Sequence, residues 1–365
     1  MPRILQVLNH LDYGGQEKLV VDYLKNINPR YTFIFLTISK APPYELGEEV
    51  LRNNGKIYYI PLNGRVAIAQ GNKQRLAKLI SDESIDVIHI HPKADYIAKF
   101  ARQENIPFVV HSHSNFFGLP PGIFKKALGY IRYITTVRKR LRRADMFLAC
   151  SISAGHFLFG RRPFKVLPNG IPAKEYAFNK TTRLNLRKSY SLLTDDVAIL
   201  HVGRMAYPKN QTFVIDAFRE YALTNPRAKL FLIGDGPDKT KLITKVKSLG
   251  LNKKVKFLGS VNSKEFYNMA DILLLPSLTE GLGTSLVEAQ ANGLYSIASA
   301  GVPRDVDFTG KIEFMAKRST PKDWAQVIGR RAKMRFDGEN LVRNSEYDIK
   351  QTVRQLEAVY DQLTV

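Results

Sequence analysis

Short apolar runs alternate with amphipathic stretches along almost the whole of this 365-residue chain. The apolar runs are continuous, as expected for parallel strands that are covered by helices on both faces. Repeated units of one strand and one helix predict an α/β fold with a doubly wound parallel sheet. The runs that we expect to form strands in the first half of the chain are 3–11, 31–39, 56–62, 86–91 and 107–114.

The same pattern starts again in the second half of the chain. There the expected strands are 197–203, 228–234, 254–258, 271–275 and 294–299. Between the two halves, residues 168–172 read Pro-Asn-Gly-Ile-Pro, a sequence that interrupts any regular element. The length also suits two α/β domains better than one. We therefore expect two Rossmann-like domains, formed by residues 1–170 and 171–344.

One more amphipathic helix is expected near the C-terminus, at about 345–365. Its apolar residues recur at helical spacing and are Val353, Leu356, Val359, Tyr360 and Leu363. A helix with such a stripe has to pack against another surface. The spacing does not decide which of the two domains supplies that surface.

Composition limits the partners and the compartment. The 55 Lys and Arg residues against 33 Asp and Glu give a net charge of +22, which suits nucleic acid, an anionic membrane or a phosphorylated small molecule. The single cysteine, Cys150, excludes an intramolecular disulfide; it lies in an apolar run, so we expect a buried thiol in a reducing cytoplasm. We expect no signal peptide, because the N-terminus has no basic region followed by a cleavage site, and no membrane-spanning helix, since no apolar stretch reaches about 18 residues.

Two basic residues follow a strand end in the second half of the chain. In parallel sheets, ligands bind beyond the carboxyl ends of the strands. Gly203 and Arg204 leave such an end, and Lys209 follows just before a helix. The planar fork of an arginine and the point charge of a lysine could together neutralise a diphosphate. The alternative is that both are solvated surface cations.

Two glutamates flank a glycine-rich turn after a later strand. The helix that we expect to open near Thr284 could offer the backbone N–H groups of its first turn to a phosphate. Glu280 precedes this helix, and Glu288 lies about one turn into it, where a carboxylate could accept both hydroxyls of a ribose. The alternative is that both glutamates are structural.

Strand ends in the first half of the chain carry two further motifs. Gly14 and Gly15 would let a ligand approach the backbone, although a tight turn without a ligand fits equally well. The turn is not G-x-G-x-x-G, so a nicotinamide dinucleotide site has little support. We expect His111 and His113 to point to opposite faces of their strand, so that one of them faces the ligand. Metal binding is not expected, because no further ligands have suitable sequence spacing.

Residues 123–143 form a basic amphipathic helix candidate. Its apolar positions are Phe124, Leu128, Ile131, Ile134, Val137 and Leu141. Its basic residues, with no acid among them, are Lys125, Lys126, Arg132, Arg138, Lys139, Arg140, Arg142 and Arg143. Such a helix can lie on an anionic membrane surface. The alternative is a solvated helix that packs on its own domain.

Taken together, these motifs resemble the GT-B glycosyltransferases of family 4, the retaining group, over nearly the whole chain. The motifs are Gly14-Gly15-x-Glu17, the strand end at His113, segments 149–160 and 166–171, Val202-Gly203-Arg204 with Lys209-Asn210, Gly234-Asp235-Gly236-Pro237, and Glu280 with Glu288. No single motif is specific, but their order is. Segments 55–61 and 153–160 are most similar to enzymes of bacterial capsular and exopolysaccharide assembly.

The resemblance implies a role for each candidate residue. Arg204 and Lys209 would stabilise the departing diphosphate, Glu280 would bind the transferred sugar, and Glu288 would bind the ribose. The remaining donor-side residues are Gly203, Gly283, Thr284 and Ser285. The acceptor-side residues are Gly14, Gly15 and His113, with His113 counted among the catalytic ones.

The resemblance also implies the reaction and its setting. A hexose-type sugar would pass from a nucleotide-diphosphate donor, with UDP expected, to a lipid-linked saccharide in a cleft between the two domains. The C-terminal helix would cross back onto the first domain. No cofactor and no metal would be needed. The enzyme would be cytoplasmic and peripheral on the inner face of the cytoplasmic membrane.

Two other functions remain open at this point. A sugar-nucleotide epimerase could use a similar two-domain scaffold, and it would release free nucleotide without any acceptor. A basic chain could instead be a non-enzymatic anion- or nucleic-acid-binding module. The aromatic residues do not interleave with the basic cluster as a base-stacking platform requires, so nucleic acid is not the expected partner.

Overall fold

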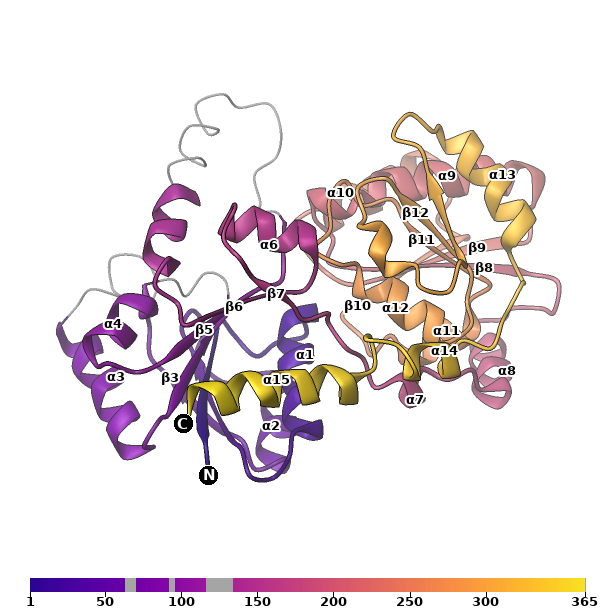
Figure 1. Cartoon of the computed structure of the whole chain (residues 1–365). Coiled ribbons are helices and arrows are strands. Elements are labelled where there is room, and N and C mark those ends of the chain that lie inside the picture. Colours follow the sequence, from indigo (N-terminus) through magenta and orange to yellow (C-terminus); the bar gives the residue numbers. More distant parts are fainter. Residues whose placement is uncertain (63–69, 92–95, 116–133, 365) are drawn as a thin grey trace. The chain divides into compact units, whose positions relative to one another are not determined.

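A computed structural model describes residues 1–62, 70–91, 96–115 and 134–364 (Figure 1). The chain forms two compact units. Unit 1 consists of Met1–Gly170 together with Ile349–Val365, and unit 2 consists of Ile171–Asp348. Each unit is built around one sheet in which every strand pairing is parallel, with helices on both faces. This confirms the predicted fold class of two doubly wound α/β domains.

In the described residues of unit 1, the sheet has seven strands in the order β3-β2-β1-β4-β5-β6-β7. Their bounds are β1 (Arg3–Leu8), β2 (Thr32–Thr37), β3 (Lys56–Tyr59), β4 (Val87–Ile90), β5 (Phe108–Ser112), β6 (Met146–Ala149) and β7 (Lys165–Val166). Strands are shorter than the apolar runs that predicted them. Leu11, for example, is fully buried but lies beyond β1, because the side chain stays in the core after the backbone has left the strand.

The helices of unit 1 surround this sheet. They are α1 (Gly15–Asn26), α2 (Gly47–Arg52), α3 (Gln70–Asp82), α4 (Ile97–Gln103), α6 (Ile152–Phe159) and α15 (Ile349–Leu363). Residues 134–141 are helical as well.

The C-terminal helix α15 belongs to unit 1, where it lies near α1 and α2 (Figure 1). Val353, Leu356 and Tyr360 enter the same hydrophobic cluster as the strands β1 and β2. The Tyr360 ring packs edge-on against Phe33 at 6.1 Å between centroids. Burial of each large apolar side chain contributes about 1.5–3 kcal/mol, so the apolar stripe holds this helix to a domain that begins more than 300 residues earlier in the chain.

In the described residues of unit 2, the sheet has six strands in the order β10-β9-β8-β11-β12-β13. Their bounds are β8 (Val197–Val202), β9 (Ala228–Ile233), β10 (Val255–Gly259), β11 (Ile272–Leu275), β12 (Ser296–Ser299) and β13 (Ile312–Met315). The helices are α7 (Ala173–Tyr176), α8 (Lys180–Ser189), α9 (Gln211–Thr224), α10 (Lys239–Ser248), α11 (Lys264–Met269), α12 (Thr284–Ala291), α13 (Pro321–Arg331) and α14 (Glu339–Arg343), with 3₁₀ turns η2 (Tyr207–Lys209) and η3 (Arg304–Val306).

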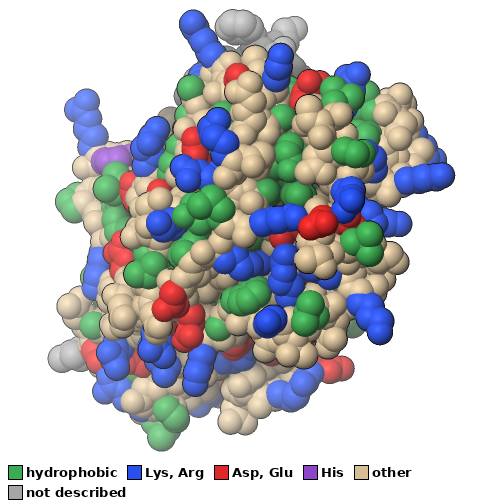
Figure 2. Space-filling view, turned by 90° about the vertical axis from the view of Figure 1, so that its right-hand side faces the viewer, with side chains coloured by type: hydrophobic (Ala, Val, Ile, Leu, Met, Phe, Trp, Pro, Cys, Tyr) green, Lys and Arg blue, Asp and Glu red, His purple; other side chains and the backbone are tan. Residues whose placement is uncertain are grey.

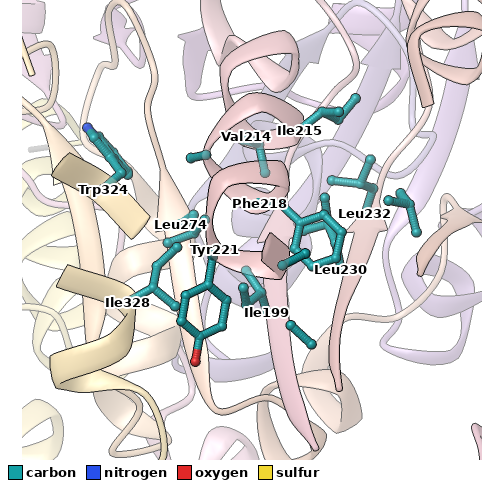
Figure 3. Close-up of a cluster of buried hydrophobic side chains, with 14 of the residues drawn as sticks. Ile199, Val214, Ile215, Phe218, Tyr221, Leu230, Leu232, Leu274, Trp324 and Ile328 are labelled. Carbon is teal, nitrogen blue, oxygen red and sulfur yellow. The ribbon is translucent and has the colours of Figure 1, made fainter. Parts of the chain in front are cut away.

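One face of this sheet is covered by α9 and α13 (Figure 3). The side chains drawn there include Ile199, Val214, Phe218, Tyr221, Leu230, Leu232, Trp324 and Ile328. Trp324, the single tryptophan of the sequence, is 2% exposed and packs edge-on against Phe213. The core of unit 2 therefore contains a spectroscopic probe that unit 1 lacks.

A buried ionic network joins α8 to the amino ends of β8 and β11. The carboxylate of Asp271 accepts hydrogen bonds from Arg183 at 2.5 Å, Arg187 at 3.0 Å and the Ala198 amide at 2.8 Å. The Asp271 side chain is 1% exposed. Because the carboxylate is fully paired, its burial is tolerated, and loss of it would leave the buried Arg187 guanidinium without a counter-charge.

Basic residues are spread over the surface. Figure 2 shows Lys and Arg side chains across the whole of the face that it presents, with fewer Asp and Glu among them. On this face they do not gather into a single stripe, so the positive charge acts as a diffuse field for anions.

Candidate active site

The donor-side candidates of unit 2 lie beyond the carboxyl ends of β8 and β11. Gly203 and Arg204 follow β8, and Lys209 closes the 3₁₀ turn η2. A Cβ atom at Gly203 would lie 3.3 Å from the Lys209 Cδ and Cε atoms. Glycine at this position therefore leaves room for the lysine side chain to cross the loop.

Lys209 reaches Glu280, which lies in the loop after β11. The Lys209 Nζ donates to Glu280 Oε1 at 2.6 Å, and the Glu280 residue is only 8% exposed. The backbone N–H of Glu280 donates to the Gly301 carbonyl, which fixes the loop. A lysine ammonium held in this way is positioned at the sheet edge where ligands bind in doubly wound domains.

Buried beneath this pair is His201 of β8. Its ring bonds the Leu274 carbonyl at 2.9 Å. Burial lowers the pKa of His201 to about 4, and the Lys209 charge acts in the same direction, opposed by the Leu274 carbonyl and Glu280. His201 is therefore neutral at pH 7 and adds no charge to the site.

Arg204 is exposed on the same loop as Lys209. Among the described residues its guanidinium has no hydrogen-bond or ion-pair partner, whereas Lys209 is paired with Glu280. Arg204 is thus the candidate cation that can meet an anionic ligand without first giving up a partner.

The helix α12 starts at the glycine-rich turn. Gly283 precedes it with a φ of +90°, a conformation that favours glycine because it lacks a Cβ. Thr284 and Ser285 occupy the first turn, where backbone N–H groups point out of the helix end and favour an anion. Gly283, Thr284 and Ser285 follow Glu280 closely in the sequence. They lie with it after the carboxyl end of β11, at the start of α12.

Glu288 is held by two tyrosines that the sequence did not single out. The Tyr176 hydroxyl donates to Glu288 Oε1 at 2.7 Å, and the Tyr267 hydroxyl donates to Oε2 at 2.5 Å. Burial and the Glu288 charge raise the pKa of Tyr267 well above its usual value, so the hydroxyl keeps its proton. The two donors come from α7 and α11, which no sequence spacing links to α12; the clue available was that buried tyrosine hydroxyls need partners.

In unit 1, the two glycines stand between β1 and α1. A Cβ atom at Gly14 would lie 2.2 Å from the Glu17 Oε2 atom, whereas one at Gly15 would meet nothing within 4 Å. Glycine at position 14 therefore lets the Glu17 carboxylate fold back over the start of the helix. Gly15 faces open space, so the backbone there is accessible.

His113 follows β5, and its neighbours correct one expectation. The rings of His111 and His113 lie 4.0 Å apart and belong to one cluster with His89 and His91. The expectation that His111 and His113 point to opposite faces was wrong, because side chains two residues apart on a strand share a face. Four imidazoles therefore gather on one side of β4 and β5.

A chain of hydrogen bonds connects His113 to the C-terminal helix. His113 Nε2 lies 2.9 Å from His91 Nδ1, and His91 Nε2 lies 3.0 Å from Gln6 Oε1. The Gln6 amide donates to the Tyr360 hydroxyl at 2.9 Å. At the other end, His113 Nδ1 lies 3.3 Å from Asn169 Oδ1. Both ring nitrogens of His113 are thus engaged, and burial lowers its pKa to about 4, so it is a neutral hydrogen-bonding group at pH 7.

The basic segment 123–143 lies mostly outside the described residues, which resume at 134. There Ile134, Val137 and Leu141 are buried. Among the basic residues of this stretch, Lys139, Arg140, Arg142 and Arg143 are exposed. Arg138 instead donates to the backbone carbonyls of His156 and Phe157. In the described part of the chain, no helix is long and apolar enough to cross a membrane.

Two sequence families match this chain in succession. Residues 13–175 match the family described as Glycosyltransferase Family 4, and residues 182–345 match the family described as Glycosyl transferases group 1. The two matches meet near the division between unit 1 and unit 2. Between them they take in the candidate residues of both units.

Relatives and solved structures agree with these matches. The putative glycosyltransferase EpsF of Bacillus subtilis is 29% identical and aligns with 98% of this chain and 96% of its own length. The capsular polysaccharide biosynthesis glycosyltransferase CapH of Staphylococcus aureus is 21% identical, with 99% of each chain aligned. The crystal structure of Anabaena HepE in complex with UDP and glucose superposes with a TM-score of 0.81 at 16% identity, covering 99% of this chain and 100% of HepE.

Proposed function

Because this chain is a glycosyltransferase that joins a family 4 domain to a group 1 domain, we propose that it moves a hexose-type sugar from a UDP-sugar to a lipid-linked saccharide in polysaccharide biosynthesis. As a transferase, the chain is neither the epimerase nor the binding module considered above. The naming of CapH supports a polysaccharide product, and the UDP and glucose bound to HepE support the donor.

The observation that carries this proposal is the ion pair of Lys209 and Glu280 in the loops that follow β8 and β11, with Glu288 on the helix α12 that starts just after Glu280. The lysine and the first glutamate are ion-paired, and the second glutamate is held by two tyrosines. A diphosphate needs cations, a ribose diol needs a fixed carboxylate, and a sugar needs a second acceptor group. In this proposal Lys209 contacts the diphosphate, Glu288 the ribose and Glu280 the transferred sugar.

Arg204 and Lys209 supply the charge for the transfer step. The bond between the anomeric carbon and the β-phosphate oxygen breaks, and the diphosphate leaves with the bonding electrons. The acceptor hydroxyl oxygen then bonds to the anomeric carbon on the same face, and its proton passes to the departing phosphate oxygen, so the configuration is retained. Cations fixed near the leaving group stabilise this charge separation without a metal ion.

The residues of unit 1 are proposed to face the acceptor. His113 is neutral and hydrogen-bonded at both ring nitrogens, so it would orient a hydroxyl rather than carry a full positive charge. Gly15 would let a saccharide approach the backbone at the start of α1, because a Cβ there meets nothing.

Thermal stabilisation by a panel of UDP- and GDP-sugars tests the donor assignment. At about 100 times its dissociation constant, a bound donor adds roughly 2.7 kcal/mol to the stability of the protein. We expect a UDP-sugar to raise Tm and Glu288→Gln to abolish the rise. Glu265→Gln, an exposed glutamate on the neighbouring helix α11, is the matched control and should respond as the unchanged protein does. An equal rise in Glu288→Gln would remove the ribose role.

We further propose that the basic segment 123–143 binds an anionic membrane, which would place the enzyme on the cytoplasmic face, next to a lipid-linked acceptor. Neutralising the exposed Lys139, Arg142 and Arg143 to glutamine leaves Arg138 and its carbonyl contacts intact. Sedimentation with phosphatidylglycerol vesicles should fall in this triple variant. Unchanged sedimentation would contradict the membrane proposal and leave the donor assignment untouched.

A further inference from the structure

Three buried imidazoles in unit 1 are arranged like a ligand set. His89 lies on β4, His91 lies just after it and His111 lies on β5, with exposures of 0%, 1% and 0%. One ring nitrogen of each lies within 4.8 Å of those of the other two. We propose that His89, His91 and His111 bind a divalent transition-metal ion of the zinc class, at a site that is structural and does not rest on the transfer reaction.

The second nitrogen of two of the three rings faces an oxygen atom. His89 Nδ1 lies 2.7 Å from the Tyr360 hydroxyl, and His91 Nε2 lies 3.0 Å from Gln6 Oε1. Metal-binding histidines almost always donate their other N–H to such an oxygen, which fixes the tautomer and aims the lone pair at the ion. His89 and His91 therefore already have the outer hydrogen-bond partners that metal-binding histidines use.

The ring nitrogens that remain for a metal make few hydrogen bonds within the protein. Among the described residues, His89 Nε2 and both ring nitrogens of His111 make no hydrogen bond, although both side chains are fully buried. His91 Nδ1 shares a hydrogen bond with His113 Nε2. A buried polar atom without a partner destabilises the fold, so three such atoms in one cluster call for a partner.

Binding an ion requires the rings to turn. His89 stacks on His91 and on His111 with interplanar angles of 21° and 12°, and an imidazole binds a metal in the plane of its ring. Imidazole nitrogens coordinate zinc at about 2.0–2.1 Å, which places neighbouring ligand atoms roughly 3.4 Å apart in a tetrahedron. The three nitrogens therefore need to draw together from separations of up to 4.8 Å.

The ligand type selects the ion. A set made only of imidazoles favours zinc, copper, nickel or cobalt over magnesium, calcium and manganese, which prefer oxygen ligands. The ligands belong to β4 and β5, neighbouring strands in the middle of the sheet, and Tyr360 of α15 touches one of them. A bound ion would cross-link β4 and β5 beneath the helix α15.

Direct titration tests the proposal. The full-length chain, with any affinity tag removed, is dialysed against EDTA and then titrated with ZnCl₂ by calorimetry and with CoCl₂ by visible absorption. We expect one equivalent of Zn²⁺ and tetrahedral cobalt bands without a thiolate charge-transfer band. No binding, or a thiolate band that Cys150→Ser removes, would overturn the proposal.

Variants locate the ion. His111→Phe keeps an aromatic ring and removes both nitrogens, so affinity should fall by more than the roughly 10–100-fold that loss of an outer-layer partner costs. Tyr360→Phe removes only such a partner, so its loss of metal affinity should lie within that range. His156→Phe removes an exposed histidine of the same unit and should bind as before. Equal affinity in His111→Phe would refute the site, and if that variant does not fold, the cobalt spectrum of the unchanged chain still decides.

Discussion

The two units share a sheet topology but place their polar groups in different parts of it. In both, the first strand lies between the second and the fourth, as β1 lies between β2 and β4, and β8 between β9 and β11. In unit 1, Gln6, His89 and His111 are fully buried within the sheet. In unit 2, the matching strands β8, β11 and β12 carry His201, Ser296 and Ser299 as their polar residues, and the charged groups lie at the strand ends.

This difference fits a division of work between the units. Buried neutral imidazoles and amides form hydrogen bonds without adding charge, so the interior of the unit 1 sheet is polar but uncharged. Lysine and arginine on loops beyond an apolar sheet suit a diphosphate, because they remain hydrated until the ligand arrives. The same fold thus supports a polar interior in one unit and a charged rim in the other.

Each unit carries its own probe, which allows the comparison to be tested. The single tryptophan, Trp324, is buried in unit 2, and the single cysteine, Cys150, is buried in unit 1. Tryptophan fluorescence therefore follows the unfolding of unit 2. The reactivity of the thiol toward a soluble disulfide reagent follows the opening of unit 1.

The largest expected effect comes from the ionic network of unit 2. Asp271→Ala should lower the free energy of unfolding by about 3–5 kcal/mol, because it leaves the buried Arg187 without a counter-charge. Urea unfolding followed by Trp324 fluorescence measures this loss. Asp195→Ala, which breaks the exposed pair with Arg227, is the control and should cost no more than about 1 kcal/mol. If both variants lose the same stability, the amino ends of β8 and β11 are not held by this network.

The next effect concerns the charge of the donor loop. Arg204→Ala should lower turnover by about 10²–10³, the typical cost of removing one group that stabilises developing charge. Steady-state rates with the donor found in the stabilisation panel measure it. Arg219→Ala, an exposed arginine in the middle of α9, should keep the normal rate. Near-normal turnover in Arg204→Ala would mean that the charged rim does not serve the transfer.

The most gradual effect is a pH dependence of the stability of unit 2. Burial lowers the pKa of His201 from its ordinary 6.5 to about 4, so the unfolded chain takes up a proton at a higher pH than the folded one. The stability that this provides is complete above pH 6.5 and is lost as the pH falls toward 4, at about 1.4 kcal/mol per pH unit. His201→Asn, whose amide can still donate to the Leu274 carbonyl, should show a shallower loss between pH 6.5 and 4.5. An equal slope in both proteins, followed by Trp324 fluorescence in urea, would exclude His201 as the group that titrates.

The sequence predicted the strand ends better than the side-chain partners. Gly203, Glu280 and Gly283 were placed in loops beyond parallel strands, because continuous apolar runs and glycine-rich turns are local signals. The roles of these residues remain predictions. The partners of Glu288 could not be foreseen, because Tyr176 lies 112 residues away along the chain and approaches through the packing of α7 on α12.

The sequence by itself determined the fold class and the family, since both depend on local periodicity and on the order of short motifs. Only the tertiary structure decided that Gln6 meets Tyr360 across 354 residues, and that four histidines from two strands share one face. These contacts depend on which strands become neighbours and on where the last helix packs. Both follow from burial of apolar surface summed over a whole domain, which no short stretch of sequence contains.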